Sequence, residues 1–338
     1  MATFLPPEME EIMRAVLCRE YGAIEKLRVE EVPAPPLRDG SVRIALHAAG
    51  VNFGEMLMVL GQYQEKPALP FTPGFEAAGV VRERGAGVAG LVVGQRVMAV
   101  LPWGGYAEEA VVPAANVFPI PDTMDLAIAA GFPIAYGTAH GAFAWRAGLK
   151  QDEWLLVLGA AGGVGLAAVE IGAAMGARVI AAAGGADKVA LARAHGASHV
   201  IDYRAEDIRE RVKAITGGRG ADVIFDPVGG DAFTAALRSV AWGGRVLVIG
   251  FASGVVPQIP ANHLLVKNVD IMGFNWGSYR QARPALLADS FTQLTGWYAG
   301  GRLKPVVSSQ LPLEKAAEAY RLLKERKATG KIVLLTGR

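Results

Sequence analysis

Residues 154–165 read WLLVLGAAGGVG, and this stretch decides the fold. Its first five residues form a short apolar run, typical of a parallel strand that is buried on both faces. Glycines at 159, 162, 163 and 165 follow, and an Ala-rich segment after them is interpreted as a helix. Glycines let the backbone turn sharply and approach a pyrophosphate, which the N–H groups of the helix N-terminus stabilise. The stretch therefore predicts a dinucleotide-binding loop, with Gly-x-x-Gly-x-x-Gly in place of the strict G-x-G-x-x-G spacing.

Downstream of this stretch, short apolar runs alternate with helical segments. We predict strands at residues 154–158, 178–183, 199–202, 222–226, 245–250 and 269–273. We predict helices at residues 164–175, 187–195, 206–215, 231–241 and 261–267. Six strands joined by five helical crossovers predict an α/β fold with a Rossmann-type, doubly wound sheet of six parallel strands.

The chain on either side of this alternation has a different character. From about residue 13 to 110, Pro and Gly separate short strand-like runs, which predicts a β-rich partial barrel with one helix at 52–61. Residues 121–143 favour a helical bridge into the alternating part. The tail is expected to contain a long helix from about 279, a helix at 313–325 and a strand at 331–336. We expect this tail to return and complete the first domain.

The composition excludes several classes of protein. The 338 residues carry a net charge of +2 without a basic run, so no electrostatic footprint for nucleic acid is present. Cys18 is the single cysteine, which excludes an intrachain disulfide framework and a cysteine-based zinc site and favours a cytoplasmic setting. Residues 1–12 are expected to form an N-terminal tail, because they lack the apolar centre of a signal peptide. Residues 155–177 are long and apolar enough for a membrane span, but the β/α alternation argues against one.

Several stretches resemble one protein family over nearly the whole chain. They read VNFGEMLMVLGQY at 51–63, PGFEAAGVV at 73–81, GGYAEE at 104–109, AYGTA at 135–139, GAAGGVG at 159–165, DPVGG at 226–230 and GKIVLL at 330–335. In combination they resemble the medium-chain dehydrogenase/reductase superfamily, specifically its zinc-free quinone oxidoreductase branch. The resemblance implies a GroES-like β-rich catalytic domain formed from both chain ends, at 13–135 and 274–338, around a Rossmann domain at 136–273. It also implies a homodimer.

The end of the second strand in the alternating part indicates which nicotinamide cofactor binds. An Asp or Glu there would bind the ribose 2′-hydroxyl, but residues 181–185 (AAAGG) contain neither. We interpret Asp187, slightly later, as a helix N-cap. Lys188, Tyr203 and Arg204 supply two cations and a hydroxyl, which suit a 2′-phosphate. The resemblance assigns NADPH preference to the Lys188 and Tyr203 positions, and the alternative for Lys188 is a solvated helix lysine.

Other candidate cofactor-binding residues come from the glycine loop and from the strand ends. Ligands bind at the carboxyl ends of parallel strands, which selects Phe251, Phe274 and Trp276. The resemblance places Thr138 near the nicotinamide ribose and Asn52 over the nicotinamide. The full set predicted to bind NADPH is Asn52, Thr138, Gly159, Ala161, Gly162, Gly163, Val164, Gly165, Gly184, Lys188, Tyr203, Phe251, Phe274 and Trp276.

The sequence predicts no metal site. A catalytic zinc site needs about three nitrogen, sulfur or oxygen ligands. The zinc enzymes of the resembled superfamily carry a cysteine where this chain has residues 52–55, and a histidine where it has Phe75. The five histidines are dispersed, and Gly196 interrupts the helix between His195 and His199. We expect each histidine to be structural or exposed.

The candidate catalytic residues are Tyr63 and Asn52. Quinones and conjugated carbonyls are already electrophilic, so they need only positioning, a hydrogen bond to the developing oxyanion and a proton. Tyr63 matches the proton-donating tyrosine of related enoyl reductases, and a phenol with a pKa of about 10 is protonated at neutral pH. The alternative for Tyr63 is a packed aromatic residue. Asn52 is expected to orient a ligand rather than to perform chemistry.

Some neighbouring residues are candidates for the wall of the acceptor slot. Apolar side chains that could line it belong to Met56, Met58, Trp103 and Trp276, and each of these is alternatively part of the core. Glu55 stands where the resembled family often has Asp.

Three functions remain open from the sequence. The leading one is zinc-independent, NADPH-dependent reduction of a quinone. The second is reduction of an α,β-unsaturated carbonyl or enoyl thioester, for which Lys66, Arg280 and Arg283 are candidate basic residues at the cleft mouth. The third is non-enzymatic binding of NADPH, as in crystallin-like relatives of this fold. A serine hydrolase is excluded, because the chain has no G-x-S-x-G motif.

Overall fold

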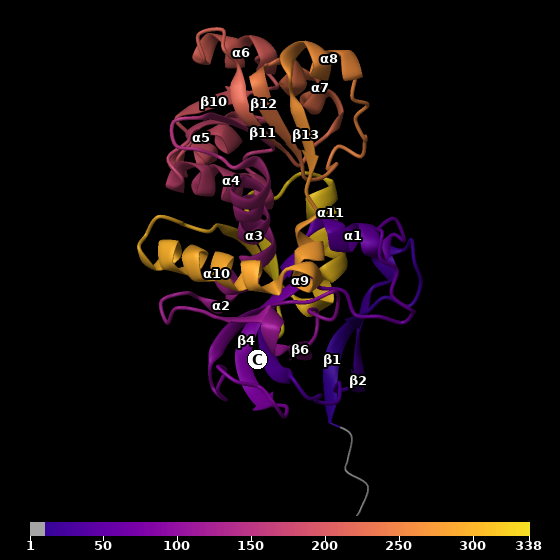
Figure 1. The fold of residues 1–338 in the computed structure, drawn as a ribbon. Coiled ribbons are helices and arrows are strands. Elements are labelled where there is room, and N and C mark those ends of the chain that lie inside the picture. The colour runs from indigo at the N-terminus through magenta and orange to yellow at the C-terminus, as the bar shows by residue number, and fades with distance from the viewer. Residues whose placement is uncertain (1–10) are drawn as a thin grey trace, which may run out of the picture.

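The computed structural model describes residues 11–338. Residues 1–10 of the predicted tail lie outside the described residues, and the first strand, β1, begins at Ile12. Figure 1 shows one lobe built on a sheet with helices around it, a β-rich lobe below, and α3 and α10 between them.

The first lobe is built on six parallel strands. They are β8 (Trp154–Leu158), β9 (Arg178–Ala183), β10 (His199–Asp202), β11 (Ala221–Asp226), β12 (Val240–Val248) and β13 (Asp270–Gly273). Their spatial order is β10-β9-β8-β11-β12-β13, and every neighbouring pair is parallel. The crossover helices are α4 (Gly163–Ala174), α5 (Ala186–Ala194), α6 (Ile208–Ile215), α7 (Gly230–Arg238) and α8 (Ala261–Lys267). The predicted doubly wound sheet is confirmed. From β8 the successive strands are added first on one side (β9, β10) and then on the other (β11, β12, β13), and sheets of this kind bind ligands at that switch point.

Helix ends in this lobe correct two predictions. Asp187 is not the N-cap of α5, because the chain enters that helix at Gly185 with φ +99°, a conformation that favours glycine. Asp187 lies in the first turn, where its charge is favourable to the helix dipole. Helix α7 ends at Arg238 rather than at residue 241, because β12 begins at Val240.

The second lobe contains a seven-stranded sheet. Its strands are β3 (Ser41–Val51), β4 (Glu76–Arg84), β5 (Arg96–Val100), β6 (Glu109–Pro113), β7 (Val117–Pro119), β14 (Val307–Pro312) and β15 (Lys331–Leu335). The order is β14-β15-β3-β4-β5-β7, and β6 also pairs with β3. A two-stranded ribbon of β1 (Ile12–Leu17) and β2 (Arg28–Pro33) packs beside it. Because β15 pairs with β3, the C-terminal tail completes the N-terminal domain, as predicted.

Helices at the junction of the lobes differ from the predictions in one place. They are α1 (Phe53–Val59), α2 (Leu126–Ala130), α3 (Pro133–Gly141), a π-helical segment (Ala142–Ala147), α9 (Tyr279–Ala282), α10 (Pro284–Ala299) and α11 (Ala316–Lys324). The long helix expected from about residue 279 is two helices, because Pro284 cannot donate a backbone bond and excludes a helical conformation at Arg283. None of the helices in residues 11–338 combines the length and apolarity needed to cross a membrane.

One hydrophobic core runs through both lobes. Buried side chains of β5 and of α2 and α3 join those of β8 and β11 in a single cluster. Phe132, Phe143 and Phe225 are fully buried within it. Each lobe also has a hydrophobic cluster of its own, one in the β-rich lobe and one between the six-stranded sheet and its helices. The shared core holds the two sheets in a defined relation, which matters because the site lies between them.

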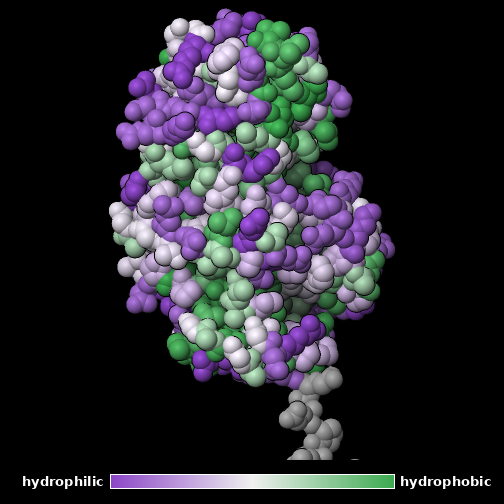
Figure 2. Space-filling view, viewed as in Figure 1, coloured by the Kyte–Doolittle hydropathy of each residue, from purple (hydrophilic) through white to green (hydrophobic). Residues whose placement is uncertain are grey.

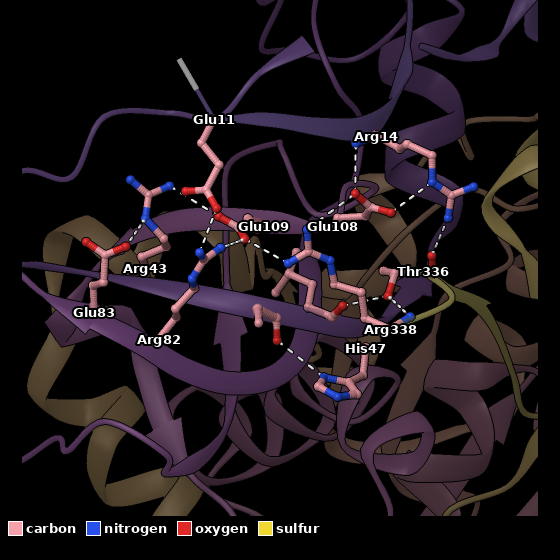
Figure 3. A network of polar contacts seen from close by, with 12 residues as sticks. Glu11, Arg14, Arg43, His47, Arg82, Glu83, Glu108, Glu109, Thr336 and Arg338 are labelled. Atoms are coloured by element: carbon pink, nitrogen blue, oxygen red, sulfur yellow. Dashed lines mark hydrogen bonds and ion pairs between the residues drawn. The ribbon is translucent and has the colours of Figure 1, made fainter. Parts of the chain in front are cut away.

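A network of ion pairs joins Glu11, Arg14 and Arg338 to strands of the β-rich lobe, and Figure 3 shows it. Its centre is Glu109, a fully buried residue that pairs with Arg43, Arg82 and Arg338. Arg14 of β1 bonds Glu108 through Nε at 2.8 Å. The network therefore anchors the last residue of the chain to strands formed by the first third of it.

Candidate functional site

A cleft of about 740 Å³ lies between the two sheets and is lined from both. Its wall includes the carboxyl ends of the parallel strands, helix α1, and residues that follow α11. It is lined by both candidate catalytic residues and by the full set predicted to bind NADPH, namely Asn52, Tyr63, Thr138, Gly159, Ala161, Gly162, Gly163, Val164, Gly165, Gly184, Lys188, Tyr203, Phe251, Phe274 and Trp276. The structure thus brings residues from position 52 to position 276 together in one cavity.

The glycine loop forms the turn that an anion site requires. Gly159 has φ +59°, and the Gly162 N–H donates to the Gly159 carbonyl at 3.0 Å, which closes the turn. Helix α4 begins at Gly163 without a side-chain cap. The first N–H groups of any α-helix have no intrahelical acceptor, so those of Gly163, Val164 and Gly165 are available at the cleft wall. Free donors and the positive end of the helix dipole suit a pyrophosphate.

A cluster of positive charges lies at the end of β9. The Lys188 ammonium donates to the Arg326 carbonyl oxygen at 2.8 Å. Burial lowers the pKa of Lys188, and the positive charges of Arg204 and Arg326 lower it further. Among residues 11–338 none of these three cations has an ion-pair partner within 4.0 Å. Such a cluster is destabilised by its own repulsion and is stabilised by a bound anion.

Tyr203 lies over the turn that follows β9. A side-chain carbon on Gly184 would come within 2.9–3.0 Å of the Tyr203 ring, so only glycine leaves room for the ring. The Asp202 carboxylate accepts the Gly185 N–H at 2.9 Å, and this bond holds the turn in place. Tyr203 lines the cleft together with Lys188 and Arg326, and Arg204 Nη1 lies 3.4 Å from the place of a side-chain carbon on the neighbouring Gly185.

Arg326 was not predicted from the sequence. It follows α11 with φ +55° and lines the cleft near Lys188, although 138 residues separate the two. An isolated arginine in a polar, basic stretch carries no local signal of a ligand. Only the return of the chain end brings it to the site.

Tyr63 lines the same cleft from the loop that follows α1. Its ring packs against Phe75 with centroids 5.5 Å apart, and it approaches Gly54 so closely that a side chain there would meet it at 3.3 Å. Burial is the largest cause that raises the pKa of Tyr63, with a contribution from the charge of Glu65. The phenol is therefore protonated throughout the neutral range and can donate a hydrogen bond.

Asn52 lines the cleft, but its side-chain amide is engaged within the protein. Its Nδ2 donates to Glu76 Oε1 at 2.9 Å and to Glu55 Oε1 at 3.2 Å. Its Oδ1 accepts from the Lys331 ammonium at 2.6 Å. These bonds fix the orientation of Asn52 at the start of α1.

Glu55 is a buried anchor for the same helix. Its carboxylate accepts hydrogen bonds from the Tyr106 hydroxyl at 2.5 Å, the Phe75 N–H at 2.5 Å and the Asn52 N–H at 3.0 Å. Burial raises the pKa of Glu55 to about 7, although these bonds and the charge of Lys331 oppose the rise. Glu55 is fully buried, so it positions the helix and makes no contact with the cleft.

Three of the remaining predicted residues, Phe251, Phe274 and Trp276, place aromatic side chains on the cleft wall after the strand ends. The indole N–H of Trp276 is buried and has no partner within residues 11–338. A buried donor without an acceptor is costly, which fits a site completed by a ligand with polar atoms. Phe274 packs against Tyr279 with centroids 5.3 Å apart. Thr138 of α3 is buried, and Phe251 is exposed at the rim.

Three candidates for the acceptor wall do not line the cleft. Met56 and Met58 of α1 are buried in the core of the β-rich lobe, on the side of the helix that faces away from the cavity. Trp103 is exposed outside it. Phe53 and Leu57, on the other face of α1, and Phe75, directly before β4, line the cleft instead.

No group of three or more His, Cys, Asp or Glu side chains is placed to hold a metal ion within residues 11–338. His195 Nδ1 contacts Glu170 Oε1 at 2.5 Å, and His140 contacts Ser290 Oγ at 2.8 Å. Both side chains serve helix packing away from the cleft.

Comparisons with known proteins agree with this geometry. Residues 38–122 match the family model described as "Alcohol dehydrogenase GroES-like domain", and residues 163–291 match "Zinc-binding dehydrogenase". The chain is 41% identical to a quinone oxidoreductase-like protein 2 homolog of Nematostella vectensis, over 98% of this chain and 91% of that protein. The structure of Escherichia coli quinone oxidoreductase complexed with NADPH is similar with a TM-score of 0.87 and 29% identity, covering 96% and 100% of the two chains. A mycobacterial protein complexed with NADPH is similar with a TM-score of 0.89 and 31% identity, covering 96% and 100%.

Proposed function

Because the chain belongs to the quinone oxidoreductase branch of the medium-chain dehydrogenase/reductase superfamily, we propose that it uses NADPH to reduce quinones. The observation that carries this proposal is that one cleft contains four features. They are the glycine loop, the cluster of cations around Lys188, an apolar slot, and the phenol of Tyr63. The cation cluster supports a cofactor with a 2′-phosphate, and the apolar slot supports a planar acceptor.

The residues present fit NADPH. The pyrophosphate would be held by the N–H groups at Gly163, Val164 and Gly165, and the 2′-phosphate by Lys188, Tyr203 and Arg326, with Arg204 close by. The other predicted residues, Asn52, Thr138, Gly159, Ala161, Gly162, Gly184, Phe251, Phe274 and Trp276, would surround the ribose and nicotinamide parts. When bound, NADPH would supply the hydride.

The chain's own residues would orient the acceptor and supply a proton. Phe53, Leu57 and Phe75 would exclude water from the slot, and Tyr63 would donate a hydrogen bond to the acceptor from its protonated phenol. Asn52 is held by its bonds to Glu76 and Lys331, so it would act as a fixed part of the wall.

Lys188→Ala is expected to weaken NADPH binding about tenfold or more and to leave NADH binding nearly unchanged. Loss of one charge-assisted hydrogen bond to the 2′-phosphate is worth about 1.5–3 kcal/mol. Fluorescence titration with each cofactor gives the dissociation constants for NADPH and NADH, and the ratio of these two constants is compared between the variant and the wild type. Lys267→Ala is a matched control, because the Lys267 ammonium also bonds a backbone carbonyl, that of Val240 at 2.7 Å, far from the cleft. Equal weakening of NADPH and NADH in Lys188→Ala would contradict the assignment.

The experiment that tests the function is NADPH consumption by the purified protein with a quinone and with an enoyl thioester as rival acceptors. Quinone turnover with preference for NADPH over NADH supports the proposal. Tyr63→Phe removes the phenolic donor and keeps the ring packed on Phe75, so turnover that uses this proton is expected to fall about 10²-fold or more. Thioester turnover that Tyr63→Phe abolishes, with no quinone turnover, would assign the protein to enoyl reduction.

The enoyl thioester alternative has one specific observation in its favour. Arg280 lines the cleft near Tyr63 and is half-buried, and desolvation is the largest cause that lowers its pKa. It forms no ion pair within 4.0 Å among residues 11–338, which leaves it available to an acceptor with an anionic tail. Lys66 and Arg283, the other basic candidates, do not line the cleft. Tight NADPH binding without turnover of either acceptor would favour the crystallin-like binding role.

A homodimer is part of the proposal. Within residues 11–338, strand β13 forms an edge of the six-stranded sheet and pairs only with β12. Beside it, Leu265 and Val266 of α8 are 80% and 75% exposed, and Figure 2 shows this apolar patch at the upper right. An open edge flanked by exposed apolar side chains supports pairing with a second copy. Sedimentation should give twice the mass of one chain, and a single-chain mass at micromolar concentration would contradict the dimer.

The domain boundaries and the cellular compartment are also proposals. We assign residues 13–135 with 274–338 to the catalytic domain and 136–273 to the Rossmann domain, since the two sheets divide in this way. The single buried thiol of Cys18 supports a cytoplasmic setting.

A further inference from the structure

One lysine connects the two halves of the cleft through its backbone and its side chain. Gly330 precedes Lys331, and the Gly330 N–H donates to the Ala161 carbonyl at 2.8 Å, so the chain pairs with the glycine loop at this point. The next residues enter β15, where Ile332 pairs with Val51 of β3. The segment therefore leads directly from the predicted cofactor loop to the residue before Asn52.

The side chain of Lys331 runs through a channel that two glycines leave open. A side-chain carbon on Gly163 would come within 2.8 Å of Lys331 Cδ, and one on Gly131 within 3.2 Å of Lys331 Cβ. Gly163 is thus small for two reasons, the approach of a pyrophosphate and the passage of this lysine. The position of the glycine loop and the position of the lysine depend on each other.

The ammonium group of Lys331 is buried and fully bonded. It donates to the Val51 carbonyl at 3.0 Å, to Asn52 Oδ1 at 2.6 Å and to Glu76 Oε1 at 2.7 Å. These acceptors use all three of its donors. Lys331 is 7% exposed and Glu76 is 0% exposed.

Glu76 extends the connection to a third part of the cleft wall. Its Oε1 also accepts from Asn52 Nδ2 at 2.9 Å, and its Oε2 accepts the N–H of Ile134 at 2.7 Å. Ile134 lies in the first turn of α3, the helix that carries Thr138. The pair therefore fixes the glycine loop, Asn52 and α3 relative to one another.

A buried ion pair of this kind is not required for stability, because apolar replacements of both partners are often neutral or stabilising. The Lys331–Glu76 pair lies where the glycine loop, Asn52 and α3 meet, so it can hold these three parts of the cleft wall in a fixed arrangement. We propose that Lys331, with Glu76, is a positioning device that sets the relation between the cofactor loop and the acceptor wall. This inference rests on the proposed function, since it concerns the alignment of the two bound molecules.

The test uses the double variant Lys331→Met/Glu76→Gln, because each single change would leave a buried charge unpaired and lower stability by itself. Methionine fills the channel, and the glutamine carbonyl can still accept from Ile134. The matched control is Lys315→Met/Glu318→Gln, which removes an exposed pair of 3.1 Å remote from the cleft. Both proteins are compared with the wild type for thermal unfolding, NADPH affinity, kcat, and amide hydrogen exchange with and without NADPH.

The double variant is expected to unfold near the wild-type temperature and to bind NADPH with an affinity within about threefold of the wild type. Its kcat is expected to fall about 100-fold, because a misplacement of the acceptor by about 1 Å has an effect of this size. NADPH should slow exchange at residues 159–166 and at 51–60 in the wild type and the control. In the double variant the protection should persist at 159–166 and disappear at 51–60.

Three results would overturn the inference and leave the proposed function intact. The first is a folded double variant with wild-type kcat. The second is a double variant in which NADPH still slows exchange at residues 51–60. The third is a wild-type protein in which NADPH never slows exchange at these residues. Failure of the wild type to bind NADPH would instead overturn the proposed function, and the inference with it.

Discussion

Gly165→Ala is expected to abolish functional NADPH binding. A methyl group at this position would come within 2.8 Å of the Gly159 carbonyl carbon and closer still to its oxygen. Both are backbone atoms of the same tight turn, so no side-chain rotation relieves the clash and the loop must open. Opening removes two or three N–H donors from the pyrophosphate, each worth about 1.5–3 kcal/mol, so affinity should fall at least about 100-fold.

The measurements are fluorescence titration with NADPH and thermal unfolding. Overpacking of this kind also costs about 1–3 kcal/mol of stability. Gly162→Ala is the matched control for folding, because its added carbon would lie 3.5 Å from the nearest atom and its φ of −81° suits alanine. The control should unfold near the wild-type temperature. Wild-type NADPH affinity in Gly165→Ala would show that the loop is not the pyrophosphate site.

Glu109→Ala is expected to destabilise the fold by about 3–5 kcal/mol, because it removes the buried carboxylate that three arginines share and leaves the buried Arg43 with only the half-exposed Glu83 as a charged partner. Glu109 accepts from Arg338 at 2.8 Å and from Arg43 at 3.3 Å, and it also pairs with Arg82 (Figure 3). Arg43 is 8% exposed, so water cannot replace the lost carboxylate. The loss of the Glu109 contact also leaves Arg338 with one ion pair, to Glu108 at 3.5 Å.

Denaturant unfolding measures this change. Glu83→Ala is the matched control, since Glu83 pairs with the same Arg43 at 3.0 Å but is about half exposed. Removal of an exposed partner should cost less than about 1 kcal/mol. A loss below about 1 kcal/mol in Glu109→Ala would contradict the central place of Glu109 in the network.

Local patterns were sufficient for the sheet and for most of the cleft. The alternation of apolar runs and helices predicts the parallel order, and the carboxyl ends of parallel strands meet at one edge. Residues taken from those ends, such as Gly184 and Phe274, therefore had to lie together. Strand β14 was missed because its sequence VSSQLP is too polar for a strand pattern, and it forms only because β15 provides a paired neighbour.

The sequence by itself determined the Rossmann-type sheet, the glycine loop and the absence of an acid after β9, because each depends on residues close together in the chain. It also indicated Tyr63 as the candidate proton donor, through a family motif. Only the tertiary structure brought Lys331, Glu76 and Arg326 to the cleft and its wall. Glu76 and Lys331 are 255 positions apart, and nothing local marks either as buried. They meet because β15 inserts beside β3, and burial then makes their charges interact strongly, since water no longer screens them.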